Sequence, residues 1–178
     1  MATDHLNVVE RKLIDNLRTG TYNTTAGIGS GNAWSDGDIT VFGQFPETED
    51  LKYPCIILEQ RANGIEQQFM GQLVSSGSST AIGELYGVGF TLTCAVETGS
   101  SITVDATAYK QRRLINYLMI NCANVLMDCD FSSSDTEVVQ RHYSGFTDVG
   151  YNAVREIWAA RSDFVIVFKN TRLSLIHI

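Results

Sequence analysis

Residues 84–130 constrain the fold more than any other part of this sequence. Between Val88 and Val96 every second residue is apolar, and the residues between them are glycine, threonine or alanine. Strict alternation of this kind is typical of a β-strand with one buried face. After a break at Gly99, apolar residues recur at helical spacing from about 106 to 127. The stretch therefore predicts a long strand and a long helix that share one core.

The basic residues of this predicted helix lie at its start. Lys110, Arg112 and Arg113 fall in the first turns, where the helix dipole disfavours cations. Either they form a solvated face, or an acidic surface on a neighbouring molecule holds them. Asp105 or Thr107 is the expected N-cap. The expected buried stripe comprises Ile115, Leu118, Cys122, Val125, Leu126 and Cys129, widened by Leu114, Tyr117 and Met119.

The remaining pattern predicts one more helix and several strands. Apolar residues at 3.6-residue spacing indicate an amphipathic helix over 4–18. Apolar runs bounded by turn residues indicate strands over 39–45, 55–60, 137–143 and 159–170, in addition to the long strand. Together these elements predict an α+β fold, with two helices packed on one face of a mostly antiparallel two-layer sheet. We expect residues 1–178 to form a single domain.

An arm is expected between the strand at 55–60 and the long strand. Residues 61–83 hold isolated apolar residues among Gln and Gly, followed by a Ser/Gly run. Two extended segments joined by such a tip predict a protruding β-hairpin. It is either a surface loop or an arm that becomes ordered against a neighbouring subunit. In the second case its candidate contact residues are Gln67, Gln68, Phe69 and Met70.

Two further segments supply candidate contact residues. Trp34 lies in the glycine-rich loop 21–38, either as an anchor for the core or as a protein contact. The loop lacks the Lys-Ser/Thr pair of a phosphate-binding loop. The C-terminal tail, 171–178, is apolar and includes Leu175 and Ile176. It either packs on its own sheet or contacts a neighbour.

Composition excludes several classes of function. The chain has 13 Lys and Arg against 20 Asp and Glu, a formal charge of −7, which argues against a dedicated nucleic-acid-binding protein. No apolar run approaches the roughly 20 residues of a membrane span, and we recognise no signal peptide. We therefore expect synthesis in a cytoplasm and no membrane partner.

The residue pattern also disfavours catalysis. His5, His142 and His177 are scattered, and neither a metal-ligand spacing nor a known catalytic motif occurs. We expect no enzyme activity, no catalytic or metal-binding residues and no cofactor. The four cysteines include Cys55 and Cys94 on two predicted strands, where they are either small core residues or a cross-strand disulfide.

The order of these elements resembles a known family. The chain has an N-terminal helix, a Tyr-Pro-Cys-Ile-Ile-Leu strand, an arm, a Gly-Phe-Thr-Leu-Thr-Cys-Ala-Val-Glu strand and an Ala-Tyr-Lys-Gln-Arg-Arg-Leu-Ile-Asn-Tyr-Leu helix. A strand pair ending in Arg-Ser-Asp-Phe-Val-Ile-Val-Phe follows. Over nearly its whole length the chain resembles tail terminator proteins of tailed bacteriophages. The likeness is one of pattern and order, so it transfers no individual functional residue.

The resemblance implies a structural virion protein in the tail-neck region. Such proteins form a ring, usually a homohexamer, that caps the head-proximal end of the tail tube, ends its polymerisation and joins it to the head connector. Expected partners are further copies of this chain, the tail tube protein, the head-tail connector or neck proteins, and a sheath protein if the tail is contractile. DNA would only pass through the lumen. The alternatives are another neck, head-completion or minor tail protein, and a small α+β hydrolase or ligand-binding domain.

Overall fold

A computed structural model describes residues 5–19, 39–44, 51–76, 79–104, 107–131 and 137–173. Its two helices are α1 (His5–Thr19) and α2 (Gln111–Asp128). Its strands are β1 (Thr40–Phe42), β2 (Cys55–Ser76), β3 (Ser79–Glu97), β4 (Ser101–Val104), β5 (Thr107–Lys110), β6 (Glu137–Phe146), β7 (Gly150–Asn152) and β8 (Ile157–Leu173).

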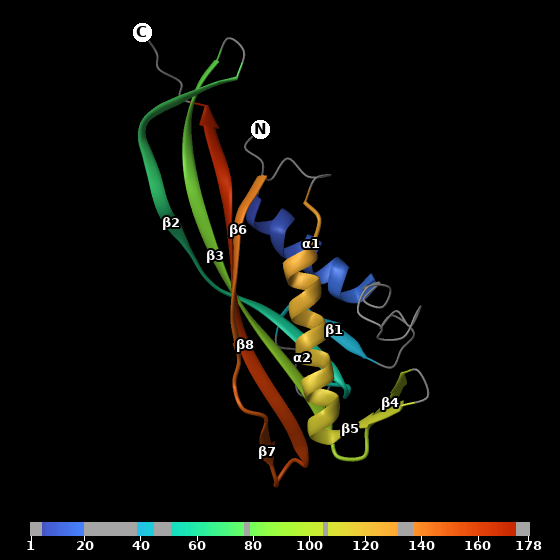
Figure 1. Cartoon of the computed structure of the whole chain (residues 1–178). Helices are drawn as coiled ribbons and strands as arrows, with labels where there is room; N and C mark the ends of the chain where they lie inside the picture. Colours follow the sequence, from blue (N-terminus) through green and yellow to red (C-terminus); the bar gives the residue numbers. More distant parts are fainter. Residues whose placement is uncertain are drawn as a thin grey trace.

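The main sheet is mostly antiparallel and carries both helices on one face. Its strand order is β1-β2-β3-β8-β6, and β7 also pairs with β8. Among the described strands of this sheet, only the short pairing of β1 with β2 is parallel. Figure 1 shows α1 and α2 lying on the same side of this long, twisted sheet. The predicted α+β architecture with two helices on one face is therefore confirmed.

The core lies between the helices and the sheet, as the alternation predicts. The alternating residues from Val88 to Val96 are at most 1% exposed and pack in one cluster with Leu13 of α1 and Leu118 of α2. Successive strand residues point to opposite faces, so Thr91 and Thr93 point away from the helices. That second side is called the open face below. Burial of apolar surface on the helix face stabilises the fold by about 25 cal/mol per Å².

The helix α2 begins later than the sequence pattern indicates. Thr107 to Lys110 form β5, which pairs with β4 in a separate two-stranded sheet. The expected N-cap at Thr107 is therefore wrong, and Asp105 lies outside the described residues. Tyr109 of β5 packs against the core, with its ring centroid 4.6 Å from that of Tyr117. This aromatic contact stabilises residues 107–110 as a strand, although the local sequence pattern favours a helix there.

The predicted arm exists, but it has three strands. Beyond the helices, β2 and β3 continue side by side as far as the pair Ser76 and Ser79. Strand β8 accompanies β3 along this extension, to the pair Ala81 and Leu173. Figure 1 shows the three strands projecting together past both helices. Residues 171–173 of the predicted tail thus belong to β8, and the rest of the tail lies outside the described residues.

Candidate assembly surfaces

The structure separates the predicted contact residues instead of gathering them. Gln67, Gln68, Phe69 and Met70 lie in the arm portion of β2, whereas Arg112 and Arg113 lie in the first turn of α2, at the opposite end of the sheet (Figure 1). Trp34, Leu175 and Ile176 lie outside the described residues. In the described part of the chain, the predicted contact residues therefore do not form one compact site.

The predicted arm residues coincide with an irregularity of the β2–β3 ladder. Gln68 pairs with Glu84, and the next pair is Leu73 with Ile82. Four residues of β2 therefore lie opposite the single residue Gly83 of β3. Extra residues of this kind bend a strand and increase its twist. Phe69 and Met70 thus lie in a bulged part of the arm.

The two predicted arginines on α2 differ in their surroundings. Both are exposed. The guanidinium carbon of Arg113 lies 5.9 Å from the ring centroid of Tyr109, within range of a cation–π contact. An intramolecular partner therefore holds Arg113 at the unfavourable end of the helix. For Arg112, which is exposed, both interpretations stay open: a solvated face, or contact with an acidic surface on a neighbouring molecule.

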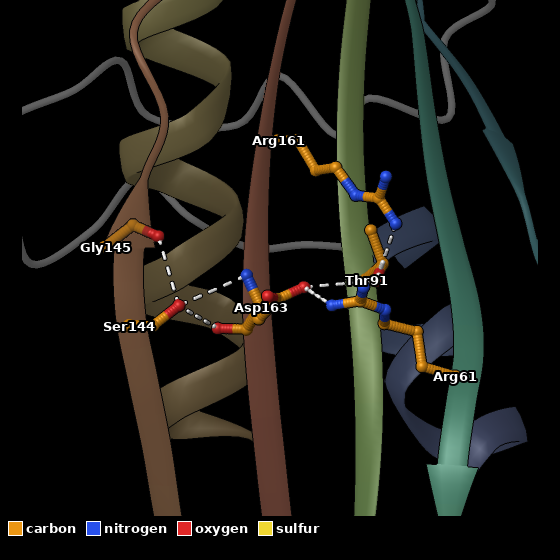
Figure 2. A network of polar contacts seen from close by, with 6 residues as sticks. All are labelled: Arg61, Thr91, Ser144, Gly145, Arg161 and Asp163. Atoms are coloured by element: carbon orange, nitrogen blue, oxygen red, sulfur yellow. Dashed lines mark hydrogen bonds and ion pairs between the residues drawn. The ribbon is translucent and has the colours of Figure 1, made fainter.

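A polar network that no sequence motif indicates crosses the open face at mid-sheet. Arg61 donates to the Asp163 carboxylate at 2.7 Å, and Thr91 donates to the same oxygen at 3.2 Å. Arg161 in turn donates to the Thr91 hydroxyl at 3.3 Å. Figure 2 shows these side chains in front of the sheet, with both helices behind it. The network links β2, β3 and β8, and its ion pair is half exposed on both sides.

A bulge in β6 extends this network to the neighbouring strand. The ladder between β6 and β8 shifts register after Tyr143, where Gly145 adopts φ +80°, a value that favours glycine. The shift leaves backbone groups of Asp163 without a ladder partner, and the Ser144 hydroxyl bonds both of them (Figure 2). Only the register of the folded strands brings these residues together, so no local sequence signal indicates the network.

An apolar groove occupies the open face beside β7. Cys55, Ile57 and Ala95 form a second buried cluster on this side of the sheet. The groove above them has a volume of about 670 Å³, and Tyr151 and Arg155 are among its lining residues. Its lining is mostly apolar but also includes Thr93, Asn152 and Arg155. This arrangement suits contact with another apolar surface better than acid–base chemistry.

A second apolar surface lies between α2 and β6. Ile120, Met127 and Phe146 are 49%, 37% and 39% exposed and line a groove of about 510 Å³ between the helix and the strand. Val139, in β6, is 50% exposed. Four of the six large apolar side chains that are strongly exposed in the described part of the chain thus gather around β6. Clustering of this kind marks contact surfaces more often than scattered exposure does.

The cysteines are buried thiols and do not form the disulfide left open by the sequence. All four are free. Cys55 pairs with Ala95, so it faces the open side while Cys94 faces the helices. Cys94 instead lies beside Cys122, with 3.9 Å between the sulfur atoms. Burial raises the pKa of Cys55 from 9.0 to about 12 and that of Cys129 to about 11, which keeps both thiols protonated at neutral pH.

Metal clusters and membrane-spanning helices are two features that the described residues lack. No group of three or more His, Cys, Asp and Glu side chains is placed there to share a metal ion. Within the same ranges, no helix is long and apolar enough to cross a membrane. His142 is exposed on β6, and His177 lies outside the described residues.

Neither protein-family models nor curated proteins give a match to this chain. The fold and its surfaces define an α+β two-layer domain with a three-stranded arm and with sheet edges that no other described strand covers over most of their length.

Proposed function

We propose that this chain is a structural virion protein that forms a ring, a homohexamer, at the head-proximal end of a phage tail tube. In this role it ends polymerisation of the tube and joins the tail to the head connector. Two lines of support are the resemblance in element order to tail terminator proteins and the surfaces described above. It places the protein in the tail-neck region of the virion and assigns it no bond-making chemistry.

The observation that carries the proposal is the arm formed by β2, β3 and β8. In the described part of the chain this extension projects past both helices (Figure 1), and its β2 edge has no strand partner beyond Ile57, which leaves backbone donors and acceptors along that edge. Such an extension is favoured when a neighbouring molecule covers it in an assembly. Two grooves with exposed apolar side chains, one on each side of the sheet, add further contact surface. A subunit that contacts several neighbours in a ring has this distribution of surfaces.

The mechanism is steric and adhesive. A closed ring repeats one heterologous interface around its axis, and a face of the ring bound to the last tube subunits blocks further addition. The formal charge of −7 suits a lumen through which DNA slides, because like charge repels phosphate. This feature predicts weak binding of duplex DNA at physiological salt, and tight binding would contradict it.

Tube growth provides the test. Purified chain is added to polymerising tail tube protein, and tube lengths are measured by negative-stain electron microscopy. We expect shorter tubes with extra density at one end, whereas unchanged lengths and bare ends would overturn the proposal. A neighbouring neck, head-completion or minor tail protein would bind the connector or another tail part without shortening the tubes.

The groove beside β7 supports a second, less favoured function. A ligand-binding domain would use this cavity of about 670 Å³ and remain a monomer. A screen of small apolar fragments by NMR, with Tyr151 and Ile157 as reporters of the groove, tests it. Saturable binding to a stable monomer would favour this reading over the ring.

A further inference from the structure

The two outer edges of the main sheet are unpaired over long stretches of the described chain. Strand β1 covers β2 only from Cys55 to Ile57. From Leu58 to Ser76 no other described strand pairs with that edge. At the other side β6 is the outermost of the described strands, among which it pairs with β8 alone. Each edge therefore presents a row of backbone donors and acceptors to whatever lies beside it.

Lysine and proline, two residues that normally prevent pairing, are absent from both edges. Proteins protect exposed edges with lysine, proline or inward-pointing charge. Residues 58–76 contain no Lys or Pro and have three charged residues, Glu59, Arg61 and Glu66. Strand β6 likewise contains no Lys or Pro, and its one glutamate is balanced by one arginine. Both edges are thus nearly neutral on a chain of charge −7, so two copies can approach at these edges without strong repulsion.

The strand directions of the two edges match. β2 is antiparallel to β3, β3 to β8, and β8 to β6. β2 and β6 therefore run in opposite directions within one copy. When a second copy related by rotation about an axis along the strands is placed beside the first, its β6 lies antiparallel to β2 of the first. The alternation of the sheet then continues across the junction without interruption.

The two edges also match in height along the sheet. Phe146 of β6 is level with Leu58 of β2, through Ser162 of β8 and Leu92 of β3. This is the first residue of β2 beyond the part that β1 covers.

The other end of β6 is aligned in the same way. Glu137 is level with Gln67, through Lys169 and Leu85. The ten residues of β6 thus lie at the same height along the sheet as the first unpaired portion of the β2 edge. A closed ring has no rise along its axis, so only edges at equal height can meet in it.

We propose that β6 of one copy pairs antiparallel with residues 58–67 of β2 in the next copy, so that the sheets join edge to edge around the ring. The partner at each of these two edges is thus a second copy of this chain. This edge-to-edge interface, called the seam below, rests on the proposed ring function and specifies the contact between adjacent subunits. It places Gln67 at the end of the seam, and it leaves Phe69 and Met70 beyond the seam for contact with other tail proteins.

Position-specific cross-linking tests the seam. His142 is level with Ala62, through Val165 and Gly89, so in the seam these positions of adjacent copies face each other. Within one copy they are three strand spacings apart, about 14 Å, farther than a short bis-maleimide reaches. The native cysteines are buried and leave the engineered thiols as the reactive ones.

The experiment mixes the full-length variants His142→Cys and Ala62→Cys, each checked for native circular dichroism, and adds the bis-maleimide. We expect cross-linked dimers from the mixture and several-fold fewer from a mixture of His142→Cys with Ser75→Cys, which lies farther along β2. The double variant His142→Cys/Ala62→Cys should give a ladder up to the full ring. Dimers from His142→Cys alone would show that β6 pairs with itself, and equal yields from the Ser75→Cys mixture would show non-specific contact. Either result overturns the seam.

The seam and the ring fail in different ways. Rings seen by electron microscopy without the Ala62–His142 cross-link would overturn the seam and leave the proposed function in place. A cross-linked ladder from a protein that never shortens tail tubes would support the seam and overturn the terminator function. Protein that stays monomeric at high concentration and gives no cross-link would overturn the seam.

Discussion

The hydroxyl of Ser144 bonds both backbone groups of Asp163. It donates to the carbonyl oxygen at 3.0 Å and accepts from the N–H group at 3.3 Å. One side chain thereby replaces the two ladder hydrogen bonds that the bulge at Gly145 removes. Because Asp163 also holds the Arg61 guanidinium, this pair of residues connects the edge strand β6 to the open-face network.

Replacing Ser144 with alanine should destabilise the protein. Loss of the hydroxyl leaves the two backbone groups of Asp163 dependent on water, with an expected cost of about 1–2 kcal/mol. Urea unfolding followed by circular dichroism measures the change. Ser101→Ala, at an exposed position of β4, is the matched control and should stay within about 0.5 kcal/mol of the parent. Equal effects of the two substitutions would contradict the role of Ser144.

The Arg61–Asp163 pair should contribute little to stability despite its short distance of 2.7 Å. Both side chains are half exposed, and solvent screens such pairs to about 0.2–1 kcal/mol. A double-mutant cycle with Arg61→Ala and Asp163→Ala, run at low and high salt, measures the coupling. We expect the coupling to shrink with salt, and a salt-independent value of several kcal/mol would show that the pair is buried in solution.

Arg141 should stabilise the end of α2. From β6 it donates to the carbonyl oxygens of Met127 and Cys129, and its guanidinium lies 5.5 Å from the Phe131 ring centroid. A cation at a helix C-terminus also interacts favourably with the helix dipole. Arg141→Ala should therefore cost about 1.5–3 kcal/mol, the range for hydrogen bonds to charged groups.

The exposed Arg155 provides the control for Arg141. Arg155→Ala removes the same side chain at a turn position and should change stability by less than about 0.5 kcal/mol. Chemical denaturation of both variants under one buffer separates the local role of Arg141 from a general effect of lost positive charge. If Arg141→Ala left the free energy of unfolding unchanged, water would satisfy the carbonyl groups at the helix end equally well.

Burial of the thiols predicts a loss of stability at alkaline pH. The pKa of Cys55 is raised to about 12 by burial, whereas an unfolded thiol titrates near 9.0. The contribution of the protonated thiol is thus complete below pH 9 and is lost as pH rises from about 9 to about 12. The free energy of unfolding of Cys55→Ala should fall less steeply across this window than that of the parent, in the presence of reductant. Parallel profiles would contradict the assignment.

Local pattern was sufficient for the parts of the fold in which side-chain period and burial agree. The alternation from Val88 to Val96 and the apolar stripe of the long helix predict the core correctly, because one face of each element is buried. The predicted start of α2 is wrong because Tyr109, in an extended strand, packs on Tyr117. This tertiary contact has no local sequence signal.

Long-range pairing explains the features that the sequence did not predict. The sequence pattern assigns residues 171–173 to the C-terminal tail, and only their pairing with β3 makes them part of β8 in the arm. The Ser144–Asp163 contact depends on the register of β6 against β8. The level match of β6 with β2 follows from the pairings of all four long strands, which no short segment encodes.

Cryo-electron microscopy of the tail that contains this chain tests the central claim most directly. The account predicts a single ring of this protein at the head-proximal end of the tube, with the sheets of adjacent copies joined at β2 and β6. Density for the chain along the tube, at its distal tip or inside the head would contradict the terminator function.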